Sequence, residues 1–351
     1  MTQVARENRG EPGNRDSRES REDAGRPRRS RRLVRRPGLR RRLLLLVCWS
    51  ALTVAAALNA VRLTGADAGT ILALPVAALP YAAAGIALLL AVFALLRARW
   101  SVLLSAVLLL GELVWLAPRF LPDGVAVAAG APRLRVATSN TQRGEVDAAA
   151  LVELVRRERI DVLATQELPV GGIRALEAAG LSRLLPHREL HPEADSSIYS
   201  RFPLVDSGVL HRPTTWPQTY AEVMLGGRQV RLVSVHTLYP LGDPQRWRAD
   251  LTALRTEALV NGRDVVLLGD FNATLDHASM RRLLSTGLVD SHAEVGRGLA
   301  PTWPVGHPWL PLMFQLDHVL HGPGLVAGSV QEYSLPGTDH RAVVAELSLT
   351  G

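Results

Sequence analysis

Three long apolar runs occupy the first third of the chain and predict membrane-spanning helices. They cover residues 43–61, 70–96 and 101–117. About 20 apolar residues in a helix are needed to cross a ~30 Å hydrocarbon layer, so the first two runs are long enough and the third is marginal. Glu112 in the third run is either functional, as intramembrane acids often are, or it simply faces the other helices or lies protonated near the interface. The pattern therefore predicts a three-helix transmembrane region at residues 43–117.

Beyond residue 132, short β-rich runs alternate with helical stretches. The runs that indicate strands lie at 134–139, 161–165, 196–200, 222–225, 229–236 and 264–269. Several are apolar throughout, as expected of strands that are covered on both faces. The pattern predicts an α/β domain over residues 133–351, with packed sheets and helices outside.

Local signals place the ends of some elements. Asp147 can cap a helix, and Asp243 followed by Pro244 can begin another helix that ends at Gly262. Between two of the predicted strands, Gly226–Gly227 suits a hairpin turn.

The positions of Arg predict how the chain is oriented in the membrane. Residues 1–42 contain fifteen Arg and six acidic residues, a net charge of +9, and Arg97 and Arg99 lie between the second and third runs. Because positive residues are enriched on the cytoplasmic side, the N-terminus is predicted to be cytoplasmic. After three spans, everything beyond Pro118 is then extracytoplasmic, in a multi-pass protein of the cell membrane. A cleaved signal peptide over the first run is the alternative.

The basic balance of the chain belongs to its N-terminal tail. Residues 1–42 are rich in Arg, Glu, Ser, Gly and Pro, so we expect them to be disordered and to lie against anionic lipid head groups. A nucleic-acid-binding arm is the alternative. Residues 133–351 carry 21 Arg and 24 acidic residues, a net charge of −3. Residues 118–132, rich in Pro, Gly and Ala, are predicted to be a linker that reaches at most ~50 Å.

Polar side chains lie at or near the C-terminal ends of several predicted strands, where a rigid scaffold can aim functional groups. Asn140, Glu167, His236, Asp270 and Asn272 lie there, and the candidate set is completed by Asp317 in QLDHVL and by Asp339 and His340 in GTDHRAVVAEL. Mg²⁺ prefers hard oxygen ligands, so Glu167 is expected to be the main metal ligand, with Asp339 or Asp270 assisting. Mn²⁺ is a possible substitute.

The remaining polar residues suit phosphoryl transfer to water. Asn140 and Asn272 can donate amide hydrogens to phosphoryl oxygens, and Asp270 can orient or deprotonate the attacking water. An Asp317–His340 pair would fix one imidazole tautomer and raise its pKa. His236 would act as the acid for the leaving oxygen or as a second phosphate contact.

Each of these residues also has a structural interpretation when taken alone. Glu167 could be a solvated or helix-capping acid, and the GDFN segment could be an Asx turn after a strand. Five other histidines are taken as structural, with His318 beside Asp317 the best placed to support the site. They are His277, His292, His307, His318 and His321.

Taken in order, eight segments resemble the endonuclease/exonuclease/phosphatase superfamily over residues 134–347. They are TSNTQ, DVLATQE, SSIYSRFPL, VSVHT, LLGDFNAT, PTWP, QLDHVL and GTDHRAVV. The resemblance implies a four-layer α/β sandwich with a Mg²⁺-dependent hydrolytic site at one end, formed by the eight polar residues above. Two positions depart from the usual pattern: Gln142 stands where some members have an acid, and Thr338 replaces a more usual Ser.

The three-helix anchor and the WPVGHPWLPLMFQLDH segment resemble the membrane-bound branch typified by the teicoplanin-resistance protein VanJ. That resemblance implies a lipid-linked phosphate or pyrophosphate substrate, such as a polyprenyl carrier, and a possible role in antibiotic resistance. Membrane lipids are then the expected partners, nucleic acid is less favoured, and no protein partner is implied.

Three other functions stay open. They are a surface-tethered nuclease, a lipid phosphodiesterase of the sphingomyelinase type, and a non-catalytic binding module. An apolar segment before Asp317 is either a lip that touches lipid or, by default, buried core. Its large residues are Trp303, Trp309, Leu310, Leu312, Met313 and Phe314.

Overall fold

The computed structural model describes residues 38–124 and 127–351. The predicted disordered tail at 1–42 therefore falls almost entirely outside the described residues. Its last residues, from Leu39 onward, form the first turn of a helix instead. Residues 46–351 form one compact unit.

The predicted apolar N-terminal helices are present. They are α1 (Leu39–Thr64), α2 (Ala73–Val76), α3 (Leu79–Leu95) and α4 (Arg99–Leu116), followed by the 3₁₀ helix η1 (Ala117–Phe120). Two described helices are long and apolar enough to cross a membrane: Leu39–Thr64, with 26 residues, and Arg99–Phe120, with 22. The three spans and their orientation stay predictions.

The second and third apolar runs differ from their predicted lengths. The second run, at 70–96, divides into the short α2 and the 17-residue α3, with Pro80 in the first turn of α3. Proline lacks the N–H that would continue a preceding helix, and its fixed φ suits a first turn. The helix formed by the third run is longer than predicted, since α4 begins at Arg99 and η1 continues it to Phe120.

The predicted linker at 118–132 does not begin as an extended, unpacked segment. Its first residues belong to η1, and Arg119 there is buried. Phe120 lies against the backbone of Gly298 so closely that a Cβ at that glycine would meet its ring at 2.7 Å.

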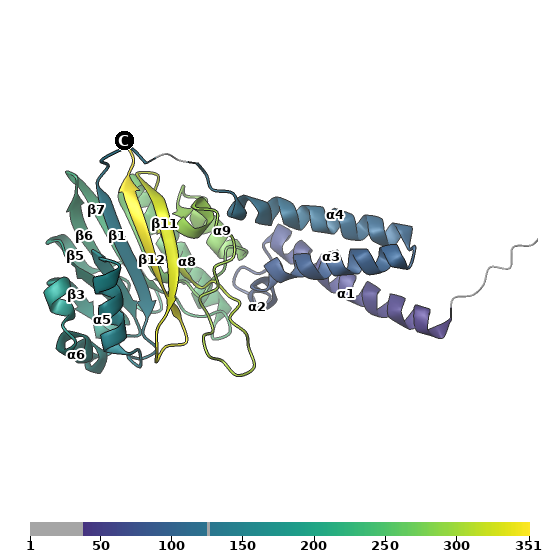
Figure 1. Cartoon of the computed structure of the whole chain (residues 1–351), viewed down its shortest axis with the longest axis horizontal. Helices are drawn as coiled ribbons and strands as arrows, with labels where there is room; N and C mark the ends of the chain where they lie inside the picture. Colours follow the sequence, from purple (N-terminus) through teal and green to yellow (C-terminus); the bar gives the residue numbers. More distant parts are fainter. Residues whose placement is uncertain (1–37, 125–126) are drawn as a thin grey trace, which may run out of the picture. The chain divides into compact units, whose positions relative to one another are not determined.

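The C-terminal part contains two six-stranded mixed sheets, which confirms the predicted sandwich (Figure 1). The first sheet has the order β11-β12-β1-β2-β4-β3, and the second has the order β5-β6-β7-β8-β10-β9. The first sheet comprises β1 (Arg133–Asn140), β2 (Val162–Gln166), β3 (His187–His191), β4 (Ser196–Ser200), β11 (Leu325–Ser334) and β12 (Arg341–Leu349). The second comprises β5 (Leu204–Val209), β6 (Thr219–Leu225), β7 (Arg228–His236), β8 (Val265–Asp270), β9 (Val289–Asp290) and β10 (Asp317–His321).

Helices cover the outer faces of both sheets. The helices are α5 (Ala148–Arg157), α6 (Val170–Ala178), α7 (Leu181–Leu184), α8 (Pro244–Asn261), α9 (Ala278–Leu284) and α10 (Ser291–Glu294), with 3₁₀ turns η2 (Pro192–Ala194) and η3 (Gly262–Asp264). Apolar residues of α5, α6 and α7 pack on the first sheet. Those of α8 and α9 pack on the second. The predicted caps are present, since the Asp147 and Asp243 carboxylates accept backbone N–H groups of α5 and α8.

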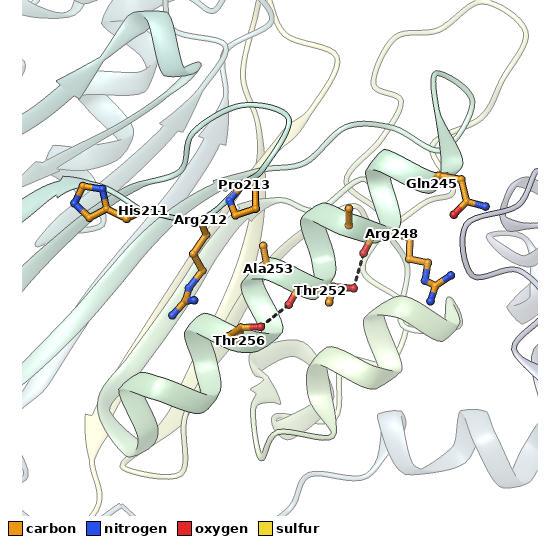
Figure 2. A pocket seen from close by; sticks show the side chains of 9 residues that line it. His211, Arg212, Pro213, Gln245, Arg248, Thr252, Ala253 and Thr256 are labelled. Carbon is orange, nitrogen blue, oxygen red and sulfur yellow. Dashed lines mark hydrogen bonds between the residues drawn. The ribbon is translucent and has the colours of Figure 1, made fainter.

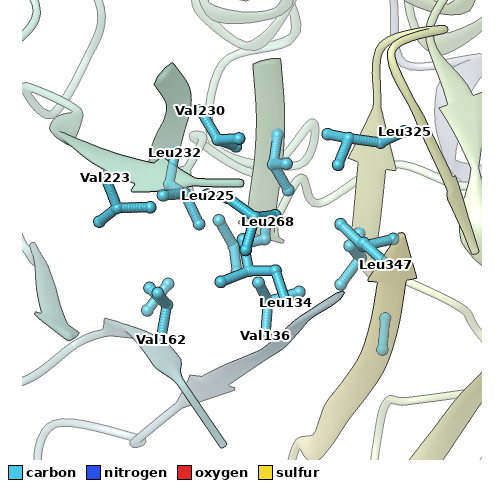
Figure 3. Close-up of a cluster of buried hydrophobic side chains, with 14 of the residues drawn as sticks. Leu134, Val136, Val162, Val223, Leu225, Val230, Leu232, Leu268, Leu325 and Leu347 are labelled. Carbon is cyan, nitrogen blue, oxygen red and sulfur yellow. The ribbon is translucent and has the colours of Figure 1, made fainter. Parts of the chain in front are cut away.

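A third apolar cluster lies between the sheets (Figure 3). Strand residues alternate between the two clusters that each sheet contacts: Val136 and Leu268 face the partner sheet, whereas Ala137 and Leu267 face the helices. This is the two-residue period of a strand. Toward the C-terminal ends of the central strands the interior becomes polar, and Gln166 of β2 donates to Ser234 of β7 at 3.1 Å. The sandwich therefore ends in a polar edge.

Candidate active site

Strand direction brings four of the predicted residues to one edge of the sandwich. Strands β1 and β2 are parallel, and so are β7 and β8. Asn140 and His236 end their strands, Glu167 directly follows β2, and Asp270 is paired with His236 across the ladder. A hydrogen bond of 3.2 Å from Asn140 Nδ2 to Asp270 Oδ2 joins the two sheets at this edge.

Asp270 is the centre of the cluster. Its Oδ2 lies 4.0 Å from His236 Nε2 and 3.8 Å from His340 Nε2. Asn140 Nδ2 also donates to Glu167 Oε1 at 3.1 Å, and that same oxygen lies 3.9 Å from His236 Nε2. Two imidazoles and one amide thus surround a pair of carboxylates, an arrangement that can hold both a cation and a phosphoryl group.

The Asp317–His340 pair has the predicted geometry. Asp317 lies opposite Asp270 on β10, and its Oδ2 accepts from His340 Nδ1 at 2.8 Å. Burial lowers the pKa of His340, but the charges of Asp317 and Asp270 and this hydrogen bond outweigh it and raise the pKa to about 10. The other carboxylate oxygen of Asp317 is buried and has no hydrogen-bond partner among the described residues.

Thr338 preserves what a serine at its position would do. Its hydroxyl donates to the Asn140 carbonyl at 2.9 Å and accepts from the His340 backbone N–H at 3.1 Å. The hydroxyl thereby links the loop before β12 to the end of β1. The departure from the usual residue therefore removes no polar contact.

His236 is held by an aspartate that sequence reasoning missed. Its Nδ1 lies 2.9 Å from Asp195 Oδ2, and Trp216 stacks on the ring with centroids 4.7 Å apart. Burial lowers the pKa of His236, but Asp195 and Asp270 outweigh it and raise the pKa. Each active-site histidine thus has its own aspartate at Nδ1. No local signal in the sequence marks Asp195, because the pairing of β2 with β4 is what brings it to the site, with its carbonyl 3.2 Å from the Glu167 backbone nitrogen.

Two predicted residues have roles that differ in detail from the prediction. Asn272 Nδ2 donates to the Thr237 carbonyl at 2.9 Å and lies 3.4 Å from Asp270 Oδ2, so its amide is already engaged in holding the loop. Asp339 Oδ2 accepts from the Trp303 indole at 2.9 Å, and its Oδ1 lies 4.0 Å from His340 Nε2. Asp339 is thus at the rim of the cluster.

The backbone around the cluster is strained. Seven non-glycine residues in the described chain have positive φ, and five of them lie in segments that adjoin the cluster: Gln142, Arg143, Glu167, Asp195 and Asn272. Such conformations cost of order 1–3 kcal/mol each and concentrate at functional sites. Strain at Glu167 and Asn272 is consistent with strand ends shaped to aim their side chains.

The donor set fits a hard divalent cation. Glu167 and Asp270 offer carboxylate oxygens on either side of the Asn140 amide. Burial and the charge of Asp317 raise the pKa of Asp270, although His340 and His236 act in the opposite direction. A nearby cation would favour the ionised carboxylate. Asp270, Asp317 and His340 also lie close enough together to share an ion. We do not assign His340 as a ligand, because its Nδ1 is bound to Asp317 and its raised pKa keeps it protonated.

The five histidines that we interpret as structural all have hydrogen-bond partners of their own. His318 lies behind the site, with Nδ1 2.8 Å from Asp290 and Nε2 2.9 Å from the Ala273 carbonyl. The partners of the remaining four are Ala73 and Thr274 for His277, Glu332 and Gln315 for His292, backbone N–H groups of Trp309 and Leu310 for His307, and Glu294 for His321.

The apolar segment before Asp317 is not buried core, and the default interpretation of it was wrong. Trp309 is 90% exposed, and Leu310, Leu312 and Met313 are half-buried. At its base, Trp303 and Phe314 stack with centroids 6.0 Å apart. The Met313 carbonyl accepts from the hydroxyl of Tyr81 in α3 at 2.7 Å. The segment is therefore a largely exposed loop that is hydrogen-bonded to α3.

A surface groove lies elsewhere, between residues 211–213 and α8 (Figure 2). Arg212 and Arg248 line it, but Arg212 is bound to Glu257 at 2.7 Å. None of the predicted site residues is among the described residues that line this groove. The predicted site residues therefore lie at the polar edge of the sandwich, apart from this groove.

Asp195→Asn is expected to move the alkaline limb of the pH–activity profile to lower pH. The change removes a charge that raises the pKa of His236, so the protonated imidazole is lost at lower pH. We expect kcat/KM to fall about 10- to 100-fold, the loss found when the hydrogen-bond partner that orients a metal-binding side chain is removed. Glu193→Gln, which removes an exposed contact to His191, is the control. An unchanged alkaline limb would show that Asp195 does not set the charge on His236.

Comparisons with known proteins agree with this geometry. The model of the endonuclease/exonuclease/phosphatase family matches residues 137–340. A humanized D. rerio TDP2 structure is 17% identical, with a TM-score of 0.51, and the match covers 62% of this chain and 99% of that one. An endonuclease/exonuclease/phosphatase family protein from Bacteroides thetaiotaomicron is 18% identical, with a TM-score of 0.50, and covers 63% of this chain and 99% of its own. At these identities the likeness shows the fold alone. No curated protein matches the chain by sequence.

Proposed function

Because the chain belongs to the endonuclease/exonuclease/phosphatase family, we propose that it is a membrane-anchored, divalent-metal-dependent hydrolase of a lipid-attached phosphate. The bond cleaved is a phosphoester or a phosphoanhydride, as in a polyprenyl phosphate or pyrophosphate. Mg²⁺ is the proposed ion, and Mn²⁺ is its expected substitute.

The observation that carries the proposal is the convergence of Glu167, His236, Asp270 and the Asp317–His340 pair in one cluster. Asn140 joins the two acids by hydrogen bonds, and both histidines lie within 4.0 Å of Asp270. Glu167 and Asp270 would hold the ion, with Asp339 at the rim. When bound, a divalent cation polarises the phosphoryl group and stabilises its developing charge.

The chain's own groups would then perform the proton transfers. Asp270 would orient and deprotonate the attacking water, since burial and the neighbouring Asp317 raise the pKa of its carboxyl group and make it a stronger base. His236 and His340, both with raised pKa values, would donate hydrogen bonds to phosphoryl oxygens and a proton to the leaving oxygen. Asn140 Nδ2, which now bridges Glu167 and Asp270, would add a neutral donor.

Two observations favour a lipid-attached substrate. Helices long enough to cross a membrane precede the site in the same chain. The loop between Trp303 and Phe314 leads from the Asp339 contact to an exposed Trp309, and indole rings favour the membrane interface. The net charge of −3 on residues 133–351 is less favourable for non-specific nucleic-acid binding, which depends on phosphate neutralisation by basic residues.

A panel of substrates tests the proposal. Full-length protein in detergent with Mg²⁺ should release phosphate from polyprenyl pyrophosphate or polyprenyl phosphate, and the metal chelator EDTA should abolish release. Trp309→Ala should raise KM for these lipids but not for a small water-soluble phosphodiester. Val260→Ala, which shortens a 68% exposed side chain on α8, is the matched control. Plasmid nicking or sphingomyelin cleavage without phosphate release from any polyprenyl lipid would replace this proposal with a nuclease or lipid phosphodiesterase.

A further inference from the structure

Asp276 is a buried carboxylate that binds two arginines of the N-terminal helical region. Its Oδ1 accepts from Arg62 Nε of α1 at 3.0 Å and from Arg119 Nη2 of η1 at 2.7 Å. Its Oδ2 accepts from Arg119 Nη1 at 2.9 Å. All three residues are buried. Burial raises the pKa of Asp276, but Arg119 and Arg62 outweigh it and lower the pKa, so the carboxylate is charged.

The two residues after Asp276 also bind the N-terminal region. His277 Nε2 lies 2.9 Å from the Ala73 carbonyl of α2. The Ala278 N–H donates to Asp67 Oδ2 at 2.7 Å. Three consecutive residues thus contact four segments that precede the catalytic domain: α1, the loop after it, α2 and η1. A simple tether would need none of these contacts.

This anchored segment continues directly from the active site. Asp270 and Asn272 lie six and four residues before Asp276. The loop from Asp270 to Asp276 contains the buried Phe271 and Ala273. So short a connection, with Phe271, Ala273 and Leu275 packed in one apolar cluster, is expected to transmit a displacement of Asp276 to the Asp270 carboxylate. Protein interiors are too densely packed to absorb such a shift locally.

We infer that Asp276 is a positioning residue: with Arg62 and Arg119 it fixes the loop that carries Asp270 and Asn272, so that the N-terminal helices form part of the active-site scaffold. The inference rests on the proposed hydrolytic function of the site. It assigns to the helices a role in catalysis that is separate from anchoring, and this role applies to soluble substrates as well.

The chain contains a matched control. Glu257 of α8 is also a buried carboxylate that bridges two arginines, with Arg212 Nε at 2.7 Å and Arg231 Nε at 2.9 Å. It contacts neither the active-site loop nor the N-terminal helices through these bonds. Asp276→Asn and Glu257→Gln each remove one buried charge that two arginines share, so both should lower the Tm, although Arg231 keeps its second partner, Glu222.

The test compares the two variants in the full-length protein with bis(p-nitrophenyl) phosphate as a soluble substrate. Asp276→Asn should lower kcat about 100-fold through misplacement of Asp270, with KM close to the wild-type value. Glu257→Gln should keep the wild-type kcat. Mn²⁺ affinity, measured by electron paramagnetic resonance, should weaken about tenfold in Asp276→Asn only.

Each outcome decides the inference. Equal losses of kcat in both variants, or wild-type kcat and Mn²⁺ affinity in Asp276→Asn, would overturn it. If Asp276→Asn does not fold, Arg119→Gln takes its place, because that variant keeps the hydrogen bond from Arg62 to Asp276. An unchanged kcat in Arg119→Gln also overturns the inference. If the wild type hydrolyses no substrate, the proposed function fails, and the Mn²⁺ comparison still judges the role of Asp276.

Discussion

Replacing His340 with Asn should lower kcat about 10²- to 10⁴-fold, the range expected for loss of a positioned proton donor. Asn can still donate to Asp317 from near the position of Nδ1, but it has no group at the position of Nε2, 3.8 Å from Asp270. The alkaline limb of the wild-type kcat/KM profile should lie at or below about pH 10, the pKa of His340 without a cation. A bound cation lowers that value. Steady-state rates with a soluble phosphodiester between pH 6 and 11 provide the measurement.

His340→Ala separates catalysis from folding at the same position. Removing the imidazole entirely leaves Asp317 as a buried carboxylate without its partner, which costs about 3–5 kcal/mol of the free energy of unfolding. His340→Asn should lose far less stability but as much activity. If both variants lose activity only in proportion to their Tm, His340 is structural and the proposed mechanism is wrong.

Replacing Asp270 with Asn should reduce kcat about 10³- to 10⁴-fold, because one carboxylate is proposed both to hold the ion and to activate water. The substitution keeps the side-chain shape and can still accept the Asn272 N–H, now 2.9 Å from Oδ1. Loss of folding should therefore be small. The measurement is kcat over a range of Mg²⁺ concentrations, together with the binding of Mn²⁺ to the purified protein.

Asp264→Asn is the control for this prediction. Asp264 directly precedes β8, at the opposite end of the strand that Asp270 ends, and it binds Arg228 there. Its replacement removes a charge from the same strand without touching the polar edge, so activity and Mn²⁺ affinity should be unchanged. Comparable losses of activity and Mn²⁺ affinity in both variants would show that the effect comes from destabilising β8 and not from the Asp270 carboxylate itself.

Part of the fold follows from local patterns that tertiary contacts do not override. The runs that became β2 and β8 are short and mainly apolar, and α8 carries both an Asp–Pro start and a Gly end. Strand β11 was missed because it contains exposed polar residues and a register shift near Gly328. A strand of that kind gains its stability from pairing with β12, which local patterning does not reveal.

The candidate site was predictable where a residue's position on its strand decides its place. Asn140, Glu167, His236 and Asp270 lie at the C-terminal ends of strands, and parallel pairing brings such ends to the same edge. The partners of these residues were not predictable. Asp195 is 41 residues from His236 in the sequence, and Arg62 is 214 residues from Asp276.

The sequence by itself determined the alternation of strands and helices, the apolar N-terminal helices and the residue types of the polar edge, because each depends on the chemistry of neighbouring residues. Only the tertiary structure decided that Asp195 orients His236, that Trp309 is exposed, and that Asp276 binds the arginines of α1 and η1. The physical reason is that burial and ion pairing are set by which distant segments the two sheets and their connections bring together.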